Sequence, residues 1–237
     1  MAGMRRVLKL PDARELSFAA AGEFTRAVGA VKKGKIHIAL SGGNTPKAFH
    51  KVIVDKLASR IPWDRVHVYW GDERCVPPDH PDSNYKMAMD TLLSHVPVPS
   101  ENIHRIMAEQ EGAAAQYESL LRREMGDSPR FDWIFLGLGP DGHTASLFPG
   151  TPAVQEGGLV CDGYMAAKQS RRITFTLPLI NAAAKVAFVV SGPEKADMVR
   201  TVLEDPPSPS HPASLVSPAQ GELLWLLDRD AASRLKA

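Results

Sequence analysis

Cysteine is scarce in this sequence. The chain has 237 residues but only two cysteines, Cys75 and Cys161, which lie far apart. Two such cysteines provide neither a disulfide framework nor the closely spaced thiol pairs of a zinc site. We therefore expect a reducing compartment, and neither disulfides nor a metal is needed to support a core in a chain of this length.

Long apolar runs are also missing. The basic start of the chain is interrupted by Lys9, Pro11 and Asp12 before a secretory h-region can form. No stretch approaches the ~20 apolar residues of a membrane span. These absences predict a cytoplasmic protein with no membrane partner.

The chain also lacks a large excess of either positive or negative charge, since the formal net charge is +1. A chain without a strong field has no general attraction for nucleic acid, so any phosphate site must be local. The hydrophobic content of 44% and the charged content of 23% are ordinary for a globular protein. We expect a single domain over residues 1–237, with the proline- and serine-rich stretch 204–217 as a loop within it.

Short apolar runs alternate with amphipathic segments, which is typical of βαβ units. The pattern predicts an α/β fold: a twisted, mostly parallel sheet with helices on both faces. Predicted strands cover residues 35–40, 66–70, 131–136, 173–177, 186–190 and 223–227. Predicted helices cover residues 13–31, 45–59, 83–93, 110–125 and 195–203. Ligands of such sheets bind beyond the carboxyl ends of the strands, where three polar clusters fall in this sequence.

The first cluster is Ser41-Gly42-Gly43-Asn44-Thr45-Pro46, between a predicted strand and a predicted helix. The glycines let backbone N–H groups approach an anion, and the helix start adds unpaired donors. The pattern favours a phosphate cradle, although a plain strand-to-helix turn remains an alternative. This cluster has neither a Gly-Lys-Ser/Thr tail nor the spacing Gly-x-Gly-x-x-Gly, so it does not match a nucleotide-binding glycine motif.

The second cluster, Trp70 to Pro77, contains Asp72-Glu73-Arg74 just past a predicted strand. An arginine at a strand end suits a phosphate or a developing oxyanion, and Asp72 suits a sugar hydroxyl or a water. A solvated loop with a local Asp–Arg pair is the alternative.

The third cluster, Gly137 to Pro149, contains His143 among several glycines and two residues after Asp141. Histidine titrates near neutral pH and can therefore take and return a proton. Glycine N–H groups can face an oxyanion. We take His143 as the candidate acid–base group and consider His37 and His67 packing residues. His50, His80, His95, His104 and His211 are expected at surface or loop positions.

Together these clusters resemble the 6-phosphogluconolactonase family. The resemblance rests on 41–46, on 70–77 with Ser83-Asn84-Tyr85, and on the Gly-x-Gly-x-Asp-Gly-His-Thr-Ala-Ser-Leu-Phe-Pro run at 137–149. Residues 172–183 and 192–196 are also similar to the family. One departure is Gln169-Ser170-Arg171, where the family often has proline.

The resemblance implies a Rossmann-like α/β fold, shared with glucosamine-6-phosphate deaminases and ribose-5-phosphate isomerases. It implies hydrolysis of 6-phospho-D-glucono-1,5-lactone to 6-phosphogluconate in the oxidative pentose phosphate pathway. No metal and no organic cofactor are expected. The expected partner is the small-molecule sugar-phosphate lactone, and the expected assembly is a monomer or weak homodimer.

Roles follow for particular residues. His143 would be the general base, positioned with its water or substrate by Asp141 and Asp72, whose separate roles the sequence does not distinguish. The oxyanion would be stabilised by backbone between Gly139 and Gly142 or by Arg74. The expected binding residues are Ser41, Gly42, Gly43, Asn44, Thr45, Arg74, Asn84, Gly142, Lys168, Arg172 and Lys195.

Two other functions remain open. The related deaminases usually place a glutamate a few residues after the corresponding histidine, whereas residues 144–150 contain no carboxylate. That absence favours the lactonase. A non-catalytic sugar-phosphate sensor is less favoured, because it would not need His143, Asp141 and Asp72 together.

Overall fold

Two sheets organise the part of the chain that the computed structural model describes, residues 4–165 and 169–236. A six-stranded parallel sheet has the order β1-β9-β8-β5-β2-β3, and a three-stranded antiparallel sheet has the order β4-β7-β6. The strands are β1 (Met4–Leu10), β2 (Ile36–Leu40), β3 (Val66–Trp70), β4 (Asp72–Arg74), β5 (Trp133–Leu136), β6 (Val160–Met165), β7 (Ser170–Phe175), β8 (Lys185–Val190) and β9 (Glu222–Asp228).

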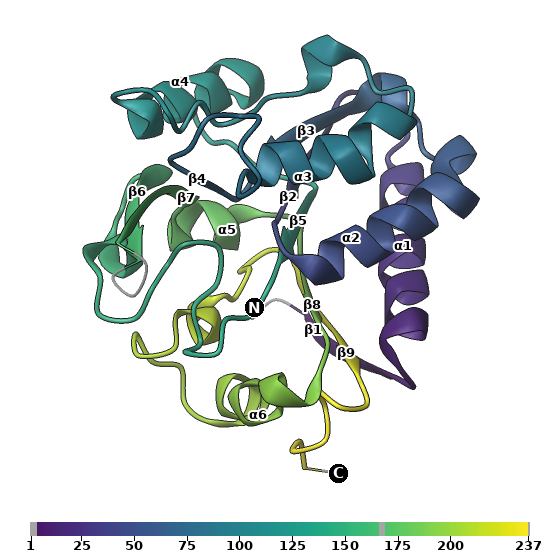
Figure 1. Cartoon of the computed structure of the whole chain (residues 1–237), viewed down its shortest axis with the longest axis vertical. Helices are drawn as coiled ribbons and strands as arrows, with labels where there is room; N and C mark the ends of the chain where they lie inside the picture. The colour runs from purple at the N-terminus through teal and green to yellow at the C-terminus, as the bar shows by residue number, and fades with distance from the viewer. Residues whose placement is uncertain (1–3, 166–168, 237) are drawn as a thin grey trace.

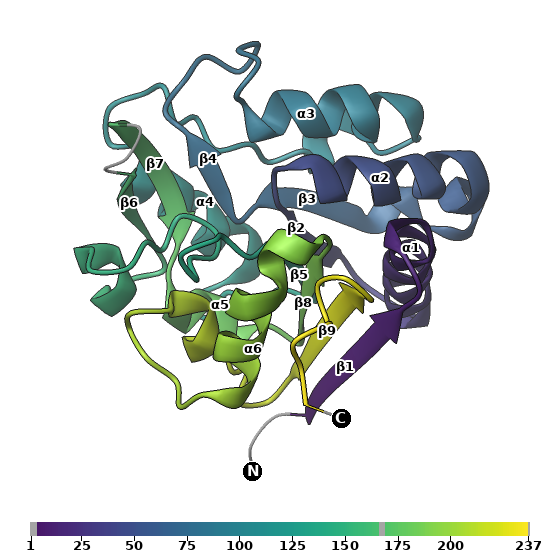
Figure 2. The same ribbon diagram turned by 60° about the horizontal axis from the view of Figure 1, so that its bottom comes forward.

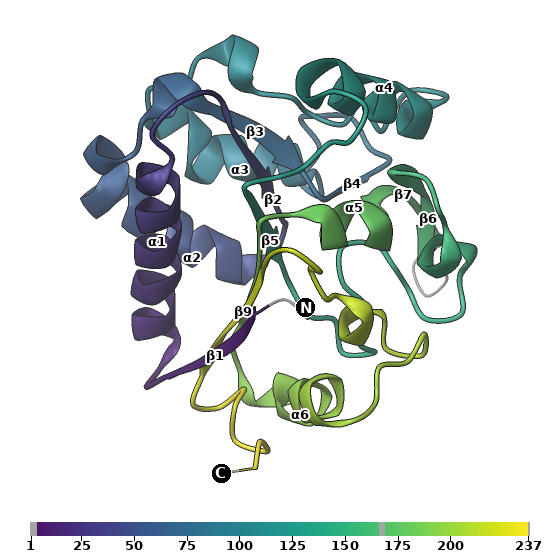
Figure 3. The ribbon, with the colours of Figure 1, turned by 180° about the vertical axis from the view of Figure 1, so that it is seen from behind.

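Helices cover both faces of the parallel sheet (Figures 1 and 2). The α-helices are α1 (Ala13–Ala30), α2 (Asn44–Val52), α3 (Asn84–Thr91), α4 (Ala113–Met125), α5 (Leu177–Ala182) and α6 (Ala196–Glu204). Figure 3 shows α1 and α2 on one side of the sheet, and α4, α5, α6 and the small sheet on the other. The predicted α/β class with a mostly parallel sheet is therefore confirmed.

Most of the parallel strands are largely apolar because they are covered on both faces, whereas the edge strand β1 has no buried residue. All five residues of β3 and all four of β5 are buried. At the β8–β9 pair, the rings of Phe188 and Trp225 stack with centroids 4.0 Å apart. Helix α1 begins where the Asp12 side chain accepts a hydrogen bond from the backbone N–H of Glu15, at 2.8 Å. No helix in the described residues has the length and apolar content needed to cross a membrane.

The direction of the chain through the sheet reverses between β2 and β5. From β2 the chain moves outward to β3, whereas β5, β8 and β9 add successively on the other side. The loops after β2 and β5 consequently diverge at the carboxyl edge of the sheet. Such a reversal leaves a crevice where ligands of open α/β sheets bind.

Several local predictions were wrong. Strands β1, β4 and β6 were not predicted, and neither was the antiparallel sheet that contains two of them. The helix predicted over 45–59 ends as α2 at Val52, after which Ile53–Leu57 forms one π-helical turn. His50 was expected at the surface but is completely buried, and its Nδ1 lies 2.8 Å from the hydroxyl of Thr91.

Candidate active site

Two adjoining hollows lie at the carboxyl edge of the parallel sheet, at the reversal between β2 and β5. The first, of about 300 Å³, is bordered by residues 41–46 and by the ends of β5 and β8. The second, of about 260 Å³, is lined by Asp72, Arg74, Asn84 and His143 among others. Ser41 and Lys195 line both. Most residues of the three sequence clusters that were assigned a role therefore meet around one crevice.

The imidazole of His143 is held by the carboxylate of Asp141. Their Nδ1 and Oδ1 atoms are 2.5 Å apart, and the same oxygen accepts the backbone N–H of His143 at 3.1 Å. An ionised carboxylate only accepts, so Nδ1 carries the proton and Nε2 keeps a free lone pair. The ring also packs against Phe148, with centroids 4.6 Å apart. The arrangement orients the imidazole so that Nε2, rather than Nδ1, can accept a proton.

The ionised form of Asp141 is favoured by this contact. Burial acts to raise the pKa of Asp141, but the hydrogen bonds from His143 outweigh it and the pKa lies below its ordinary value. The side chain of His143 is 19% exposed and that of Asp141 is 49% exposed. The pair is consequently accessible from the hollow, and the lowered pKa of Asp141 favours its carboxylate form.

Glycine is required where the turn crosses the imidazole. A Cβ atom on Gly139 would overlap Nδ1 of His143. The turn is closed by backbone hydrogen bonds from Gly139 N–H to the His143 carbonyl, 2.9 Å, and from Gly142 N–H to the Gly139 carbonyl, 3.1 Å. These two N–H groups are therefore already used and are not available to an oxyanion. Nearby Ala145 has a positive φ of 47°, which is uncommon for a residue with a side chain.

Asp72 is fixed by two neighbours, one from the nearby start of α3 and one from the third cluster. Its Oδ2 accepts the hydroxyl of Ser146 at 2.7 Å. The side-chain amide of Asn84 donates to the Asp72 carbonyl at 2.9 Å, and a Cβ on Gly42 would overlap the Asn84 side chain. Asp72 is 8% exposed and lines the same hollow as His143. Asp72 thus presents a rigid carboxylate to the cavity, while Asp141 serves the imidazole.

The buried carboxylate of Glu73 holds the backbone around Asp72 and Asn84 in place. Its carboxylate accepts the backbone N–H groups of Arg74, Asn84 and Tyr85, each at 2.8 Å, and the hydroxyl of Ser83 at 3.1 Å. Burial raises the pKa of Glu73 although the backbone hydrogen bonds oppose the change. Glu73 therefore ties the start of α3, and with it Asn84, to strand β4.

Arg74 and Arg172 face each other across the β4–β7 pair. They are register partners, and Arg74 donates to the carbonyl of Asp82. Burial, followed by the charge of Arg74, lowers the pKa of Arg172. The Nε atoms of both are buried without a hydrogen-bond partner among the described residues. Two adjacent guanidinium groups of this kind provide a local positive field, which the net charge of the chain does not.

The first cluster and Lys195 form the other wall. Helix α2 begins after Gly43, whose φ is 111°, and no side chain caps its first turn. The unpaired N–H groups of that turn border the first hollow, where they favour an anion. The Lys195 ammonium donates to the Leu138 carbonyl at 3.0 Å and so lies between the two hollows.

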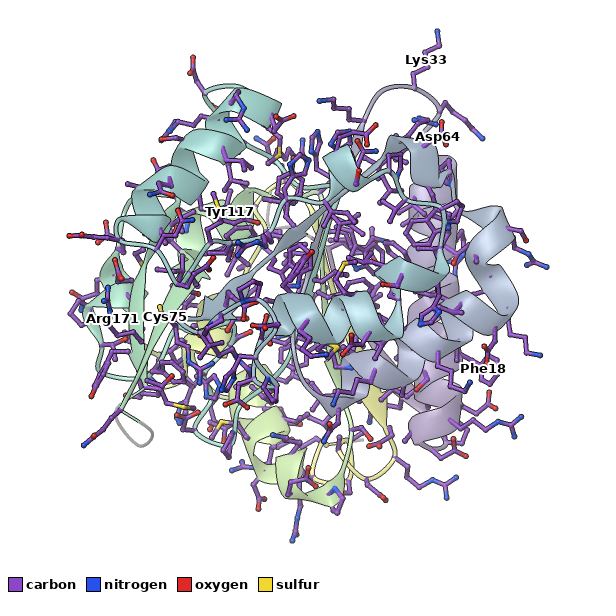
Figure 4. All side chains as sticks on the ribbon, turned by 45° about the horizontal axis from the view of Figure 1, so that its top comes forward. Phe18, Lys33, Asp64, Cys75, Tyr117 and Arg171 are labelled. Atoms are coloured by element: carbon purple, nitrogen blue, oxygen red, sulfur yellow. The ribbon has the colours of Figure 1, made fainter. Side chains whose placement is uncertain are left out.

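Other predicted residues lie apart from the hollows. Gly142 has φ 82° and borders His211 of the 204–217 loop, and Arg172 lines neither hollow. Lys168 lies outside the described residues. Cys75 lies beside Arg171 at the outer edge of the small sheet (Figure 4), with its N–H donating to the Arg171 carbonyl at 3.2 Å. Burial raises the pKa of the Cys75 thiol, which disfavours the thiolate.

The sequence analysis missed two contributing residues. Ser146 was within the third cluster without a role, because its contact with Asp72 spans 74 positions. Glu73 was seen only as one of three consecutive charges. The available signal was the helix start at Ser83-Asn84, ten residues after Glu73, whose N–H groups need an acceptor.

The comparisons with known proteins agree on one family. Residues 11–225 match the profile of the glucosamine-6-phosphate isomerases/6-phosphogluconolactonase. The chain is 44% identical over 221 residues to a 6-phosphogluconolactonase of Synechocystis sp., covering 90% of this chain and 89% of that protein. It is 42% identical over 223 residues to a probable chloroplastic 6-phosphogluconolactonase of Oryza sativa subsp. indica, covering 87% and 68%. The solved 6-phosphogluconolactonase of Trypanosoma brucei superposes with a TM-score of 0.86 at 26% identity, covering all of both chains. The chain therefore belongs to the glucosamine-6-phosphate isomerase/6-phosphogluconolactonase family.

Proposed function

We propose that this enzyme hydrolyses 6-phospho-D-glucono-1,5-lactone to 6-phosphogluconate in the pentose phosphate pathway. The observation that carries the proposal is the oriented His143–Asp141 pair in a crevice whose other wall is the uncapped start of α2. The pair provides a base for water, and the helix start provides a place for a phosphate. The names of the Synechocystis and Oryza relatives support the same substrate.

His143 acts first as a base and then as an acid. Its Nε2 removes a proton from water while the water oxygen attacks the C1 carbonyl, and Nδ1–H remains bonded to Asp141. The tetrahedral intermediate then collapses, the bond from C1 to the ring oxygen breaks, and the imidazolium returns its proton to that oxygen. No proton is gained or lost by the protein over the cycle.

We assign stabilisation of the negatively charged oxygen of the tetrahedral intermediate to Arg74. The N–H groups of Gly139 and Gly142 are engaged within the turn, whereas Arg74 lines the hollow beside His143. Arg172 adds positive charge behind Arg74. One preorganised donor to an oxyanion is typically worth about 3 kcal/mol in the transition state.

Substrate binding falls to the remaining cluster residues. The backbone of Ser41, Gly42 and Gly43, with Asn44, Thr45 and Lys195, holds the 6-phosphate. Asp72 and Asn84 orient sugar hydroxyls at the second hollow. Remote binding of the phosphate reduces the entropic cost of placing C1 beside His143.

The test compares wild type with His143→Ala on lactone generated in place, after subtraction of spontaneous hydrolysis. We expect kcat to fall by about 10²–10⁴-fold, with KM little changed, because the imidazole acts on the reacting water rather than on the phosphate. Release of ammonia from glucosamine 6-phosphate is measured in parallel. Ammonia release without lactone turnover would replace the proposal with the deaminase, and binding of 6-phosphogluconate without either reaction would favour the sensor.

Location and assembly belong to the same proposal. We place the enzyme in the cytoplasm as a monomer or weak homodimer. The two free cysteines agree with a reducing compartment. Light scattering at several protein concentrations measures the assembly, and a stable tetramer would contradict it.

A further inference from the structure

A second polar cluster lies at the opposite edge of the parallel sheet from the crevice. His67 is the second residue of β3, whereas Asp72 follows the end of that strand. At about 3.3 Å per residue the two positions are separated by roughly 16 Å along the chain. His104 comes directly after Ile103, which forms an isolated β-bridge with Val68 of β3. Glu124 lies in the last turn of α4. The proposed reaction uses none of these three side chains.

The three side chains converge on one small region. Nδ1 of His67 and Nε2 of His104 are 3.0 Å apart. One potential ligand atom from each of His67, His104 and Glu124 lies within 4.8 Å of the others. In a tetrahedral zinc site with bonds of about 2.0–2.1 Å, neighbouring ligand atoms are about 3.3 Å apart. The two nitrogens already have nearly this spacing, and the carboxylate needs to approach by about 1.5 Å or less.

We propose that His67, His104 and Glu124 form a binding site for Zn²⁺ or a similar divalent transition-metal ion. Two imidazoles and a carboxylate are a ligand set that zinc prefers over magnesium or calcium, and water completes the coordination. The site is separate from the lactone crevice and takes no part in hydrolysis.

The surroundings suit ligation by neutral histidine. Burial lowers the pKa of His104 to about 4, and burial also lowers the pKa of His67. Both rings are therefore neutral near pH 7, which is the form that binds a metal. One of the two nitrogens donates the hydrogen bond between them, so binding requires that ring to move its proton to its other nitrogen.

The ammonium group of Lys35 would compete with a metal ion for the carboxylate of Glu124. Its ammonium lies 3.0 Å from the carboxylate of Glu124. The hydrogen bond from Lys35 is the largest cause that lowers the pKa of Glu124. A divalent ion bound by the cluster would displace this ammonium into solvent. Removal of the Lys35 charge should therefore strengthen metal binding.

A bound ion would join three separate segments. His67 belongs to β3, His104 to the loop beside it, and Glu124 to α4. Tyr117, also on α4, already links these segments, because its hydroxyl donates to the His104 carbonyl at 3.0 Å and accepts the N–H of Trp70 at 3.1 Å. The ion would act on the same junction and stabilise the folded chain.

Calorimetric titration of metal-free protein with zinc chloride tests the site. We expect wild type to bind one Zn²⁺, with affinity at least tenfold lower in His104→Gln and in Glu124→Gln, since loss of even an outer partner costs about 10–100-fold. Lys35→Met should bind more tightly, and Tm should rise with zinc in wild type more than in His104→Gln. Magnesium chloride should give no comparable binding.

The matched control is His95→Gln, which removes an exposed histidine outside the cluster. His95→Gln and His143→Ala should retain wild-type zinc affinity, and His104→Gln should retain wild-type lactone turnover. Absence of zinc binding by wild type would overturn the proposal. So would equal binding by Glu124→Gln, a variant at a partly exposed helix position that keeps its packing, or loss of binding in His143→Ala.

Discussion

The hydrogen bond between His143 and Asp141 distinguishes this imidazole from the others in the chain. His37 and His67, by contrast, pack among other aromatic rings at the far edge of the sheet. The carboxylate determines which nitrogen of His143 carries the proton, and the Phe148 ring limits its rotation. In the proposed mechanism, reactivity at His143 therefore depends on Asp141, which holds the imidazole and does not itself take the proton from water.

Replacement of that partner tests its contribution. In Asp141→Asn the amide can donate to Nδ1 and favour the wrong tautomer, so we expect kcat to fall by about 10²–10⁴-fold while the fold is retained. Steady-state kinetics and circular dichroism measure the two quantities. Asp162→Asn is the control, since Asp162 is an exposed carboxylate paired with Arg171. A variant with wild-type kcat would remove Asp141 from the mechanism.

The absence of a side chain at position 139 is equally specific. Gly139→Ala places a methyl group where Nδ1 of His143 lies, and the ring must move. Because misplacement by about 1 Å can cost 10²-fold, we expect at least a tenfold loss of kcat. Gly157→Ala, where an added Cβ meets nothing within 4 Å, should behave as wild type. Equal kcat in the two variants would show that the imidazole tolerates displacement.

The part of the site that the sequence could predict consists of residues close together in the chain. His143, Asp141 and Gly139 lie within one turn. Their residue types alone indicate proton transfer at a place where a substrate can come close to the backbone. Ser146 and Asp72 meet only because β4 pairs with β7, beside which the Ser146 N–H donates to Thr174. Contacts across such separations depend on tertiary structure, which periodicity does not encode.

At the scale of elements, strand β4 and helix α3 are joined by one buried carboxylate. Glu73→Ala leaves the N–H groups of Asn84, Tyr85 and Arg74 without their acceptor. Buried donors without partners cost about 1–3 kcal/mol each where water does not replace the acceptor, so we expect the free energy of unfolding to fall by about 3 kcal/mol or more. Urea unfolding measures the change. Glu101→Ala, at an exposed position, should cost less than about 0.5 kcal/mol.

Most of the strands that the sequence predicted are largely buried strands of the parallel sheet. The runs that became β2, β3, β5 and β8 are apolar except for His37, His67 and Lys185, and their short length separates them from helices. Strand β4 consists of Asp72, Glu73 and Arg74, and β6 contains Gly163. Such residues form strands only because β7 supplies hydrogen-bond partners between them, so their local composition indicates a loop.

At the scale of the whole molecule, buried neutral histidine makes stability depend on pH. Burial lowers the pKa of His50 to about 3, and burial with the charge of His67 lowers those of His37 and His104 to about 4. The unfolded chain binds protons below pH 6.5 while the folded chain does not. The stabilisation is therefore complete above pH 6.5 and is lost as pH falls toward these lowered values.

His50 gives the sharpest measurement of this effect, because it is completely buried. Between pH 6.5 and 5 one such group should remove about 2 kcal/mol from the free energy of unfolding. In His50→Leu the slope of that free energy against pH should be correspondingly shallower. His95→Gln, at an exposed position, should keep the wild-type slope. An unchanged slope in His50→Leu would mean that His50 is protonated within the fold.

The crevice is built from segments that are synthesised at widely separated times during translation. Ser41 emerges early, Asp72 and His143 later, and Lys195 only after four-fifths of the chain has been made. Strand β5 also needs β8 beside it, and β8 needs β9, which lies within the last sixteen residues. A chain that stops before β9 therefore lacks a strand on which the crevice depends, and we expect it to have no activity. Activity becomes possible only when synthesis has passed Asp228 and the sheet can be completed.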